Sequence, residues 1–411
     1  MRKPKIRFKG YTDDWEQRKL EDFGIATGGT SIESEFSEDG KYKVISIGSY
    51  SENSVYNDQG IRAVESEKTL KRVLNKGDLT MILNDKTASG NIIGRALLIE
   101  ESGVYVYNQR TERIEINDEE YDSLFIYEML NAPNIREKII KQAQGNTQIY
   151  VNWSVITLTE YLIPKKEEQI RIGQYFSNLD NLITLHQRKC DETKKIKKYM
   201  LQKMFPQNGT DVPGIRFDGF TDAWEQRKLC EIAEKVTEKN KNNEFSETLT
   251  NSAEQGIISQ KEYFDREIVN EDNLDGYYVV RDNDFVYNPR VSATAPVGPI
   301  NRNRLGRNGV MSPLYTVFRT HDIDHLFLEY FFKTTIWHRF MKLNGDSGAR
   351  FDRFTIGAAQ FMGMPIPYPD IDEQKKIGQY FDNLDHLITL HQRKLEMLKK
   401  IKKSMLENMF A

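Results

Sequence analysis

Three short motifs place polar residues at spacings that catalysis could use. The first, Asn288-Pro289-Arg290, begins like the Asn-Pro-Pro-aromatic motif of adenine methyltransferases. It lacks the second proline and the aromatic residue, and no glycine-rich strand–turn–helix fingerprint accompanies it. We therefore expect no methyl-transfer centre at this motif.

The second motif is Pro369-Asp370, which is followed by Glu373 and Lys375 as in some nuclease sites. Its two parts lie too close together for such a site, and the first half of the chain has no matching Pro-Asp. We interpret the motif as a turn that leads into a helix.

The third motif places His321 and His325 four residues apart, a spacing that puts both rings on one face of a helix. Zinc hydrolases carry a glutamate base after the first histidine, whereas Asp322 stands here. Asp324 suits the start of a helix, where an acid favours the helix dipole. The sequence also has no G-x-x-x-x-G-K-[ST] phosphate loop. We therefore predict no catalytic site, no metal site and no cofactor in this chain.

An internal repeat is the strongest pattern in the sequence. RFKGYTDDWEQRKL (7–20) returns as RFDGFTDAWEQRKL (216–229), and the segment 168–189 returns as 373–394 with the shared core IGQYF-x-NLD-x-LITLHQRK. The chain is therefore two copies of one unit, each with a lead-in that contains tryptophan, a long middle and a closing helix.

The middles of the two copies differ strongly, although they have nearly equal lengths. We infer that the lead-ins and helices face each other or two copies of one partner, while the middles face two different targets. Drift after duplication, faster in loops, is the alternative explanation. Drift does not explain why long helices that are rich in surface residues stayed alike.

Both closing segments carry apolar residues at alternating spacings of four and three, which predicts a heptad seam. Some 40 residues of helix make a rod of about 60 Å, and we predict that the two rods pair antiparallel. The two histidines of the seam are expected to be buried and hydrogen-bonded. The predicted interface residues are Phe176, Leu179, Ile183, His186, Phe381, Leu384, Ile388 and His391.

The middles are expected to be mixed α/β domains, with strands first and then helix. We predict a pair of helices interrupted by Pro133 in the first copy and one helix at 325–343 in the second. Polar loops rich in turn residues punctuate the strands at 27–31, 84–91 and 144–150 in the first copy and at 287–296, 301–309 and 345–353 in the second. Such side chains read base edges and hold phosphates. Ordinary solvated turns remain the alternative for any single loop. The candidate DNA-contact residues are Thr30, Asn84, Lys86, Thr87, Ser89, Asn146, Thr147, Gln148, Arg290, Ser292, Arg302, Arg304 and Arg350.

Composition sets further limits. The 411 residues are 38% hydrophobic and carry a net charge of -3, which is unusual for a protein that binds DNA without partners. The two cysteines, Cys190 and Cys230, fit no metal spacing and suggest a reducing compartment. No apolar stretch follows the charges of the N-terminus, so we expect a cytoplasmic protein rather than a secreted one.

Taken together, the W-E-x-R-K-L lead-ins, the I-P-x-P-x-x-x-E-Q pattern from Ile366 and the QGNTQ and GDSGA loops resemble the specificity subunits of type I restriction–modification enzymes. The first copy departs from the pattern at Lys166, where the second proline would stand. The resemblance covers essentially the whole chain.

The resemblance implies a binding subunit without catalysis. Each middle would read one half of a split, asymmetric site on double-stranded DNA. The paired helices would set the spacer and dock two modification subunits that carry S-adenosylmethionine. Restriction subunits with ATP and Mg would join the larger complex. A free-standing methyltransferase or nuclease, and a coiled-coil scaffold that does not bind DNA, are the competing hypotheses.

The predicted fold class is α+β, with a pseudo-twofold repeat. The predicted domains are a first recognition domain at 1–163, a central helix at 164–206, a second recognition domain at 207–366 and a C-terminal helix at 367–411.

Overall fold

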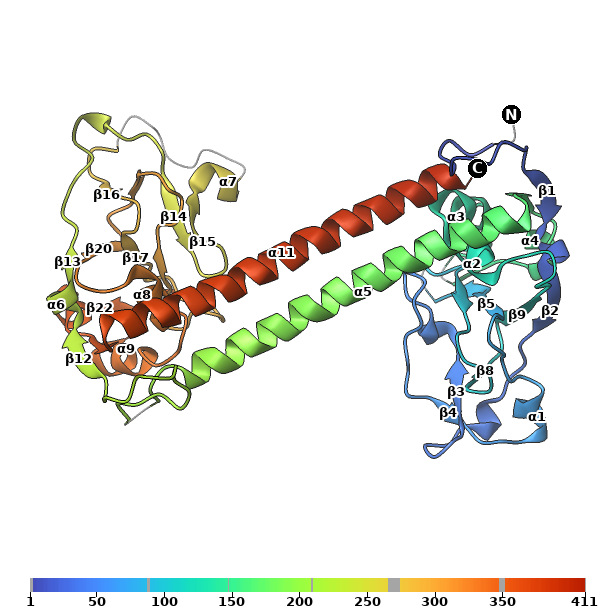
Figure 1. The fold of residues 1–411 in the computed structure, drawn as a ribbon, viewed down its shortest axis with the longest axis horizontal. Helices are drawn as coiled ribbons and strands as arrows, with labels where there is room; N and C mark the ends of the chain where they lie inside the picture. The colour runs from blue at the N-terminus through green and yellow to red at the C-terminus, as the bar shows by residue number, and fades with distance from the viewer. Residues whose placement is uncertain are drawn as a thin grey trace. The chain divides into compact units, whose positions relative to one another are not determined.

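The computed structural model describes residues 3–86, 89–146, 148–207, 210–264, 274–346 and 352–410. Two compact units make up the chain: unit 1 comprises residues 1–187 and 392–411, and unit 2 comprises residues 188–391. Each unit therefore contains part of both long helices, α5 (Lys166–Lys203) and α11 (Ile371–Met409) (Figure 1).

Unit 1 is built on two sheets. The larger is antiparallel, in the order β2-β9-β5-β7, and the smaller has the order β4-β3-β8. All four residues of β5 are buried, as expected of a central strand. The strands are β2 (Gly24–Gly28), β3 (Tyr42–Ile45), β4 (Arg62–Ala63), β5 (Leu79–Ile82), β6 (Asn84–Asp85), β7 (Ala96–Leu98), β8 (Tyr105–Tyr107), β9 (Thr111–Ile116) and β10 (Ile149–Tyr150). The short helices are α1 (Glu67–Leu70), α2 (Ser123–Asn131), α3 (Pro133–Ile140) and α4 (Trp153–Ile156).

Unit 2 repeats the larger sheet with β13-β20-β17-β18 in the corresponding order. Two further strand pairs, β14·β15 and β16·β19, are formed by strands that lie between those of the larger sheet in the sequence. The strands are β13 (Ala233–Lys235), β14 (Leu249–Ser252), β15 (Gly256–Ser259), β16 (Tyr278–Val280), β17 (Phe285–Tyr287), β18 (Ile300–Arg302), β19 (Gly309–Met311), β20 (Thr316–Thr320), β21 (Gly345–Asp346) and β22 (Thr355–Ile356). The short helices are α6 (Leu229–Ile232), α7 (Gln260–Phe264), α8 (His325–Phe332), α9 (His338–Asn344) and α10 (Ala358–Met362).

The lead-ins form strands, which the sequence analysis did not predict. β1 (Glu16–Lys19) pairs antiparallel with β11 (Glu160–Ile163), and β12 (Glu225–Lys228) pairs with β23 (Pro365–Tyr368). Each pair joins the start of a middle to its end. Pro367 is tolerated because β23 lies in a sheet of only two strands.

In each unit the two long helices run antiparallel, as predicted. In unit 1, Phe176 of α5 stacks on Phe410 with ring centroids 5.7 Å apart. In unit 2, Phe381 of α11 stacks on Phe205 at 6.1 Å. Phe205, which closes the first repeat, therefore packs in unit 2, and Phe410, which closes the second repeat, packs in unit 1.

A glycine at the same place in each helix allows a close approach. A Cβ at Gly173 would lie 2.6 Å from Asp122 Oδ1, and one at Gly378 would lie 2.6 Å from Leu326 Cβ. The N-termini of α2 and α8 press against these positions, where Asp122 and Asp324 cap the two helices. Larger residues would push the short helices away from the long ones.

One predicted helix is divided in two in the structure, and a predicted pair of helices is confirmed. Residues 325–343 were expected to form a single helix, but the chain breaks between α8 and α9, where Thr334 Oγ1 donates to Phe331 O at 2.7 Å. The predicted pair of helices around Pro133 is present as α2 and α3. The predicted α+β class with paired helices is therefore confirmed. Among the described residues, no helix has the length and apolar character needed to cross a membrane.

Candidate nucleic-acid interface

In unit 1, two of the predicted loops lie side by side. β6 pairs antiparallel with β10, so that Asn84 is opposite Tyr150 and Asp85 is opposite Ile149. This short ladder joins loop 84–91 to loop 144–150, although about 60 residues separate them in the sequence.

In unit 2, the corresponding loops converge in the same way. Arg290 and Arg353 form an isolated bridge, Val291 N donates to Asp352 O at 3.1 Å, and Phe354 N donates to Pro289 O at 2.8 Å. Loop 287–296 therefore lies beside the end of loop 345–353. The two middles differ in sequence, but they bring equivalent loops together.

A pocket of about 370 Å³ opens beside the converging loops of unit 1. Lys86 and Gln148, both predicted from the sequence, line it together with Glu33 and the turn 108–110. Asn108 Nδ2 and Gln109 Nε2 both donate to Glu33 Oε1, at 3.0 and 2.9 Å. The hydrogen bond from Asn108 lowers the pKa of Glu33 below its usual range, so this carboxylate is ionised at neutral pH.

The other predicted contact residues of the loops are also at the surface. Thr30 accepts a hydrogen bond from Arg72 Nη2 at 3.3 Å, and the Oγ of Ser292 accepts from Ala295 N at 3.1 Å. Ser89, Asn146, Gln148, Arg290 and Ser292 are exposed, and Asn84 is half-buried. Thr87, Thr147 and Arg350 lie outside the described residues.

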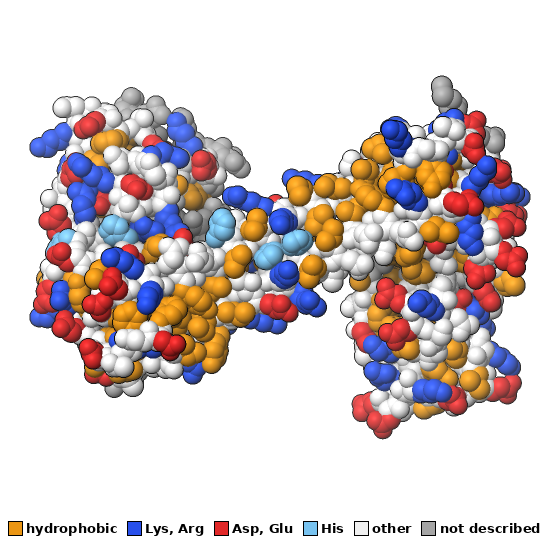
Figure 2. Space-filling model, viewed as in Figure 1, with side chains coloured by type: hydrophobic (Ala, Val, Ile, Leu, Met, Phe, Trp, Pro, Cys, Tyr) orange, Lys and Arg blue, Asp and Glu red, His pale blue; other side chains and the backbone are white. Residues whose placement is uncertain are grey.

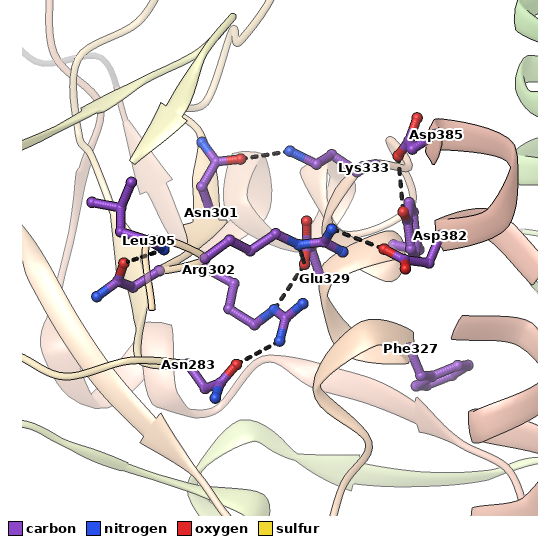
Figure 3. Close-up of polar contacts among 12 residues, drawn as sticks. Asn283, Asn301, Arg302, Leu305, Phe327, Glu329, Lys333, Asp382 and Asp385 are labelled. Carbon is purple, nitrogen blue, oxygen red and sulfur yellow. Dashed lines mark hydrogen bonds and ion pairs between the residues drawn. The ribbon is translucent and has the colours of Figure 1, made fainter. Parts of the chain in front are cut away.

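Ion pairs attach Arg302 and Arg304 to the helices of unit 2, and Figure 3 shows Arg302 beside Glu329. Both Nε atoms contact Glu329 Oε2 of α8, at 2.8 and 2.7 Å, and Arg304 Nη1 reaches Asp382 of α11 at 2.8 Å. Burial disfavours the charge of Arg304, but Glu329 and then Asp382 outweigh it and raise its pKa above the ordinary value. These contacts attach β18 and the residues after it to two helices, so the geometry gives no support to DNA contact by this pair.

A buried amide network continues from the same cluster. Lys333 Nζ donates to Asn301 Oδ1 at 2.6 Å (Figure 3). Asn301 Nδ2 donates to Asn251 Oδ1 at 2.7 Å. Burial lowers the pKa of Lys333. Asn251 Nδ2 in turn donates to Val286 O at 2.7 Å, which fixes β14 against β17. The network therefore links β14, β17 and β18 to the C-terminal end of α8.

The motifs that resembled catalytic sites have structural roles. Asn288 is buried, and its amide donates to Asn251 O at 2.8 Å while it accepts from Arg290 N. Asp324 accepts from Phe327 N at 2.8 Å and caps α8, as predicted. Asp370 accepts from Asp372 N at 2.8 Å in the turn before α11, also as predicted. Among the described residues, no group of three or more His, Cys, Asp or Glu could hold a metal ion.

Several buried ion pairs that were not predicted from the sequence position these elements. Arg7 makes a bidentate contact with Glu168, and Arg216 makes the same contact with Glu373. All four residues lie inside the repeated blocks, so the repeat itself was an available signal. Two other pairs, Asp78 with Arg113 and Asp284 with Arg319, join neighbouring strands and had no such signal.

The predicted seam residues of the helices fall into two groups. Phe176, Leu179 and Phe381 are buried. Ile183, His186, Leu384, Ile388 and His391 are half-buried, so the two histidines are less enclosed than expected. Apolar side chains also remain on the visible face of the helices between basic ones (Figure 2). The exposed apolar residues of α5 and α11 are Leu182, Ile196, Tyr199, Ile371, Leu387, Leu390 and Met397.

Comparisons with known proteins agree with this architecture. The chain is 22% identical over 356 residues to the type I restriction enzyme MjaVIII specificity subunit of Methanocaldococcus jannaschii, covering 81% of this chain and 78% of that protein. A putative type I restriction enzyme MjaX specificity subunit of the same organism is 24% identical, covering 96% and 92%. The crystal structure of a type I restriction-modification S subunit from M. genitalium shares the fold, with a TM-score of 0.61 at 16% identity and coverage of 100% and 99%.

A family model gives the assignment. The model described as the type I restriction modification DNA specificity domain matches residues 12–195 and again residues 221–400, which is most of the chain. The two matches contain the repeated helix segments 168–189 and 373–394, the larger part of each lead-in and both sets of converging loops. The chain therefore belongs to the family of type I restriction–modification DNA-specificity proteins.

Proposed function

We propose that this chain selects the DNA sequence on which a type I restriction–modification complex acts, and that each unit reads one half of a bipartite, asymmetric site. The observation that carries the proposal is the repeated convergence of two polar loops at the same place in both units. Because the loops differ in sequence within a repeated framework, the two half-sites differ as well.

The paired helices are the docking surface for modification subunits in this proposal. Leu182 of α5 and Leu387 of α11 occupy equivalent repeat positions, and each is 43% exposed. Exposed apolar side chains that recur in two copies suit two copies of one partner. Helix length then sets the spacer between the half-sites.

In this proposal the partner subunits, not this chain, carry the catalytic sites. The modification subunits carry S-adenosylmethionine and methylate adenine, restriction subunits supply ATP- and Mg-dependent cleavage, and the complex works in the cytoplasm. The net charge of -3 supports a shared role in DNA affinity, because neutralising phosphates requires cations that this chain does not hold in excess.

The test is a selection from a randomised pool of DNA duplexes by the full chain together with its modification subunit. We expect enrichment of a motif with two parts and a fixed spacer. A complex that enriches no motif would contradict the proposal. A methylation assay on the chain alone checks the other part, since turnover without partners would show that the chain is itself a methyltransferase.

Docking is tested separately by replacing Leu182 and Leu387 with serine. The double variant should fold and lose most of its affinity for the modification subunit in a co-purification assay. Val55→Ser is the matched control, because Val55 is 60% exposed but lies outside the helices. Equal loss of partner binding in the control would contradict this use of the helix surface.

A further inference from the structure

The turn between β8 and β9 is unusual in its backbone. It consists of Asn108, Gln109 and Arg110, and Arg110 has a φ of 66°. Residues other than glycine rarely adopt this left-handed conformation, and it persists where the surroundings impose it. Here Leu83 N donates to Arg110 O at 3.0 Å, which ties the turn to the residue before β6.

Side-chain contacts fix the rest of the turn. Asn108 Oδ1 accepts from Ile32 N at 3.1 Å, while Glu33 holds the amides of Asn108 and Gln109. Gly29 lies so close that a Cβ there would meet Asn108 O at 2.0 Å. The predicted loop 27–31 therefore supports the turn through its backbone. The result is a rigid tip with Arg110 at its end.

Arg110 lies at the border of the pocket with the donors of its guanidinium unused. Arg110, Lys86 and Gln148 are exposed and line the pocket from three different segments. Within the described part of the chain, the side chains of these three residues have no hydrogen bond or ion pair. By contrast, the following arginines of unit 1 are paired or bonded internally: Arg7, Arg18, Arg72, Arg95, Arg113 and Arg136.

Unit 2 has an equivalent tip with different chemistry. Ile114 of β9 pairs with Leu79 of β5, and Phe318 of β20 pairs with Phe285 of β17. Counting four residues back from each reaches Arg110 in unit 1 and Leu314 in unit 2. Leu314 is 59% exposed, and its N–H contacts Ser312 Oγ at 3.4 Å. An apolar side chain thus extends from the tip where unit 1 has a guanidinium.

We propose that these two tips read base edges in the major groove, with Arg110 selecting guanine in one half-site and Leu314 contacting a thymine methyl group in the other. The inference rests on the proposed function and names residues that determine specificity. Arginine donates two hydrogen bonds to guanine O6 and N7, and apolar side chains contact the thymine methyl group.

A phosphate contact at the tips fits the structure less well. A leucine offers no donor to a phosphate, yet it occupies the register position of Arg110. In unit 1 the Glu33 carboxylate lines the same pocket, and it would repel a phosphate. Base edges present donors, acceptors and methyl groups, so they account for both tips.

The experiment compares Arg110→Ala and Leu314→Ala with the wild type, each as the full chain bound to its modification subunit, in selections from a randomised duplex pool. We expect Arg110→Ala to reduce discrimination for guanine about ten- to a hundredfold at one position of one half-site. Leu314→Ala should reduce a thymine preference several-fold at one position of the other half-site. The exchanges Arg110→Leu and Leu314→Arg should alter the preferred base at those same positions.

Salt dependence separates the alternatives. In Arg110→Ala, DNA binding could weaken equally for all sequences, with the slope of log affinity against log salt concentration reduced by about 1. That result would identify Arg110 as a phosphate contact and overturn the proposal. Unchanged preferences in both variants of a selective wild type would overturn it while leaving the proposed function intact. A wild type that enriches no motif overturns both. Lys71→Ala is the control, because Lys71 is an exposed cation of unit 1 that pairs with Glu67.

Discussion

The two units share a framework of buried charges but use their exposed cations differently. Arg7 with Glu168 and Arg216 with Glu373 repeat almost atom for atom. Among the described residues near the candidate interface, Lys86 and Arg110 of unit 1 and Arg290 of unit 2 have no ion pair, whereas three arginines after β18 begins are paired with acids: Arg302, Arg304 and Arg307. The comparison indicates that duplicated contacts maintain the fold, while the exposed loops and tips were free to diverge toward different targets.

The largest predicted effect comes from the closing aromatic residues. Phe410→Ala should destabilise unit 1, and Phe205→Ala should destabilise unit 2, each by about 3–5 kcal/mol, because each leaves a cavity in a packed core. Hydrogen exchange resolved by peptide measures the loss in each unit. Tyr199→Ala, at a 53% exposed position of α5, is the control. If Phe205→Ala loosened unit 1 instead, the assignment of helix ends to units would be wrong.

The repeated ion pair should be more costly to break in unit 1 than in unit 2. Arg7→Ala leaves Glu168 buried without another side-chain donor among the described residues, and should cost about 3–5 kcal/mol. Arg216→Ala should cost about 1–2 kcal/mol less, because Trp224 Nε1 still donates to Glu373 at 3.1 Å. Urea denaturation of both variants measures the difference. Equal losses would show that the indole does not compensate.

The stability of the two units should depend differently on pH, because one position next to the long helices carries a different residue in each unit. Glu128 of α2 lies six residues after its cap, as Tyr330 of α8 does. Glu128 contacts Lys402 at 3.2 Å, and Lys402 also contacts Asp180 at 2.6 Å. Burial raises the pKa of Glu128 to about 7, although Lys402 opposes the shift. In unit 2, the Tyr330 hydroxyl donates to Asp385 at 2.8 Å instead.

The direction of this pH dependence follows because Glu128 binds its proton more tightly in the folded state than in the unfolded state. As pH rises from about 4.5 to about 7, Glu128 ionises in the folded chain after it has ionised in the unfolded chain, so the free energy of unfolding falls. We expect the free energy of unfolding to fall by about 1–3 kcal/mol over this window. In Glu128→Gln this fall should be absent. Denaturation at pH 5 and pH 8 measures it. Tyr330→Phe should leave the slope unchanged, and an equal slope in wild type and Glu128→Gln would contradict the assignment.

The smallest effect is expected for Arg307→Ala. Its two contacts with Glu247 are both 2.7 Å, but its side chain is 49% exposed and solvent screens the pair, so the free energy of unfolding should stay nearly unchanged. Because this arginine is already paired, its removal should also leave the preferred DNA sequence unchanged. A change in sequence preference as large as that of Arg110→Ala would break the distinction between paired and unpaired arginines.

Local patterns predicted much of the fold. The heptad spacing placed the long helices, because a period of 3.5 residues is visible in the sequence. The break after α8 was missed because Thr334 and Thr335 carry no glycine or proline signal. Arg110 was missed because its importance comes from strand register and from contacts with Ile32 and Glu33 far away in the chain. Lys86 and Gln148 were predicted from turn composition, but only the β6·β10 ladder brings them to one pocket.

The most direct test of the central claim is to replace residues 20–160 with the corresponding segment of another family member and map methylated adenines across the genome in cells that carry the modification subunit. If each unit reads its own half-site, one half of the methylated motif changes, while the other half and the spacer stay the same. A change in both halves, or in neither, would contradict the account.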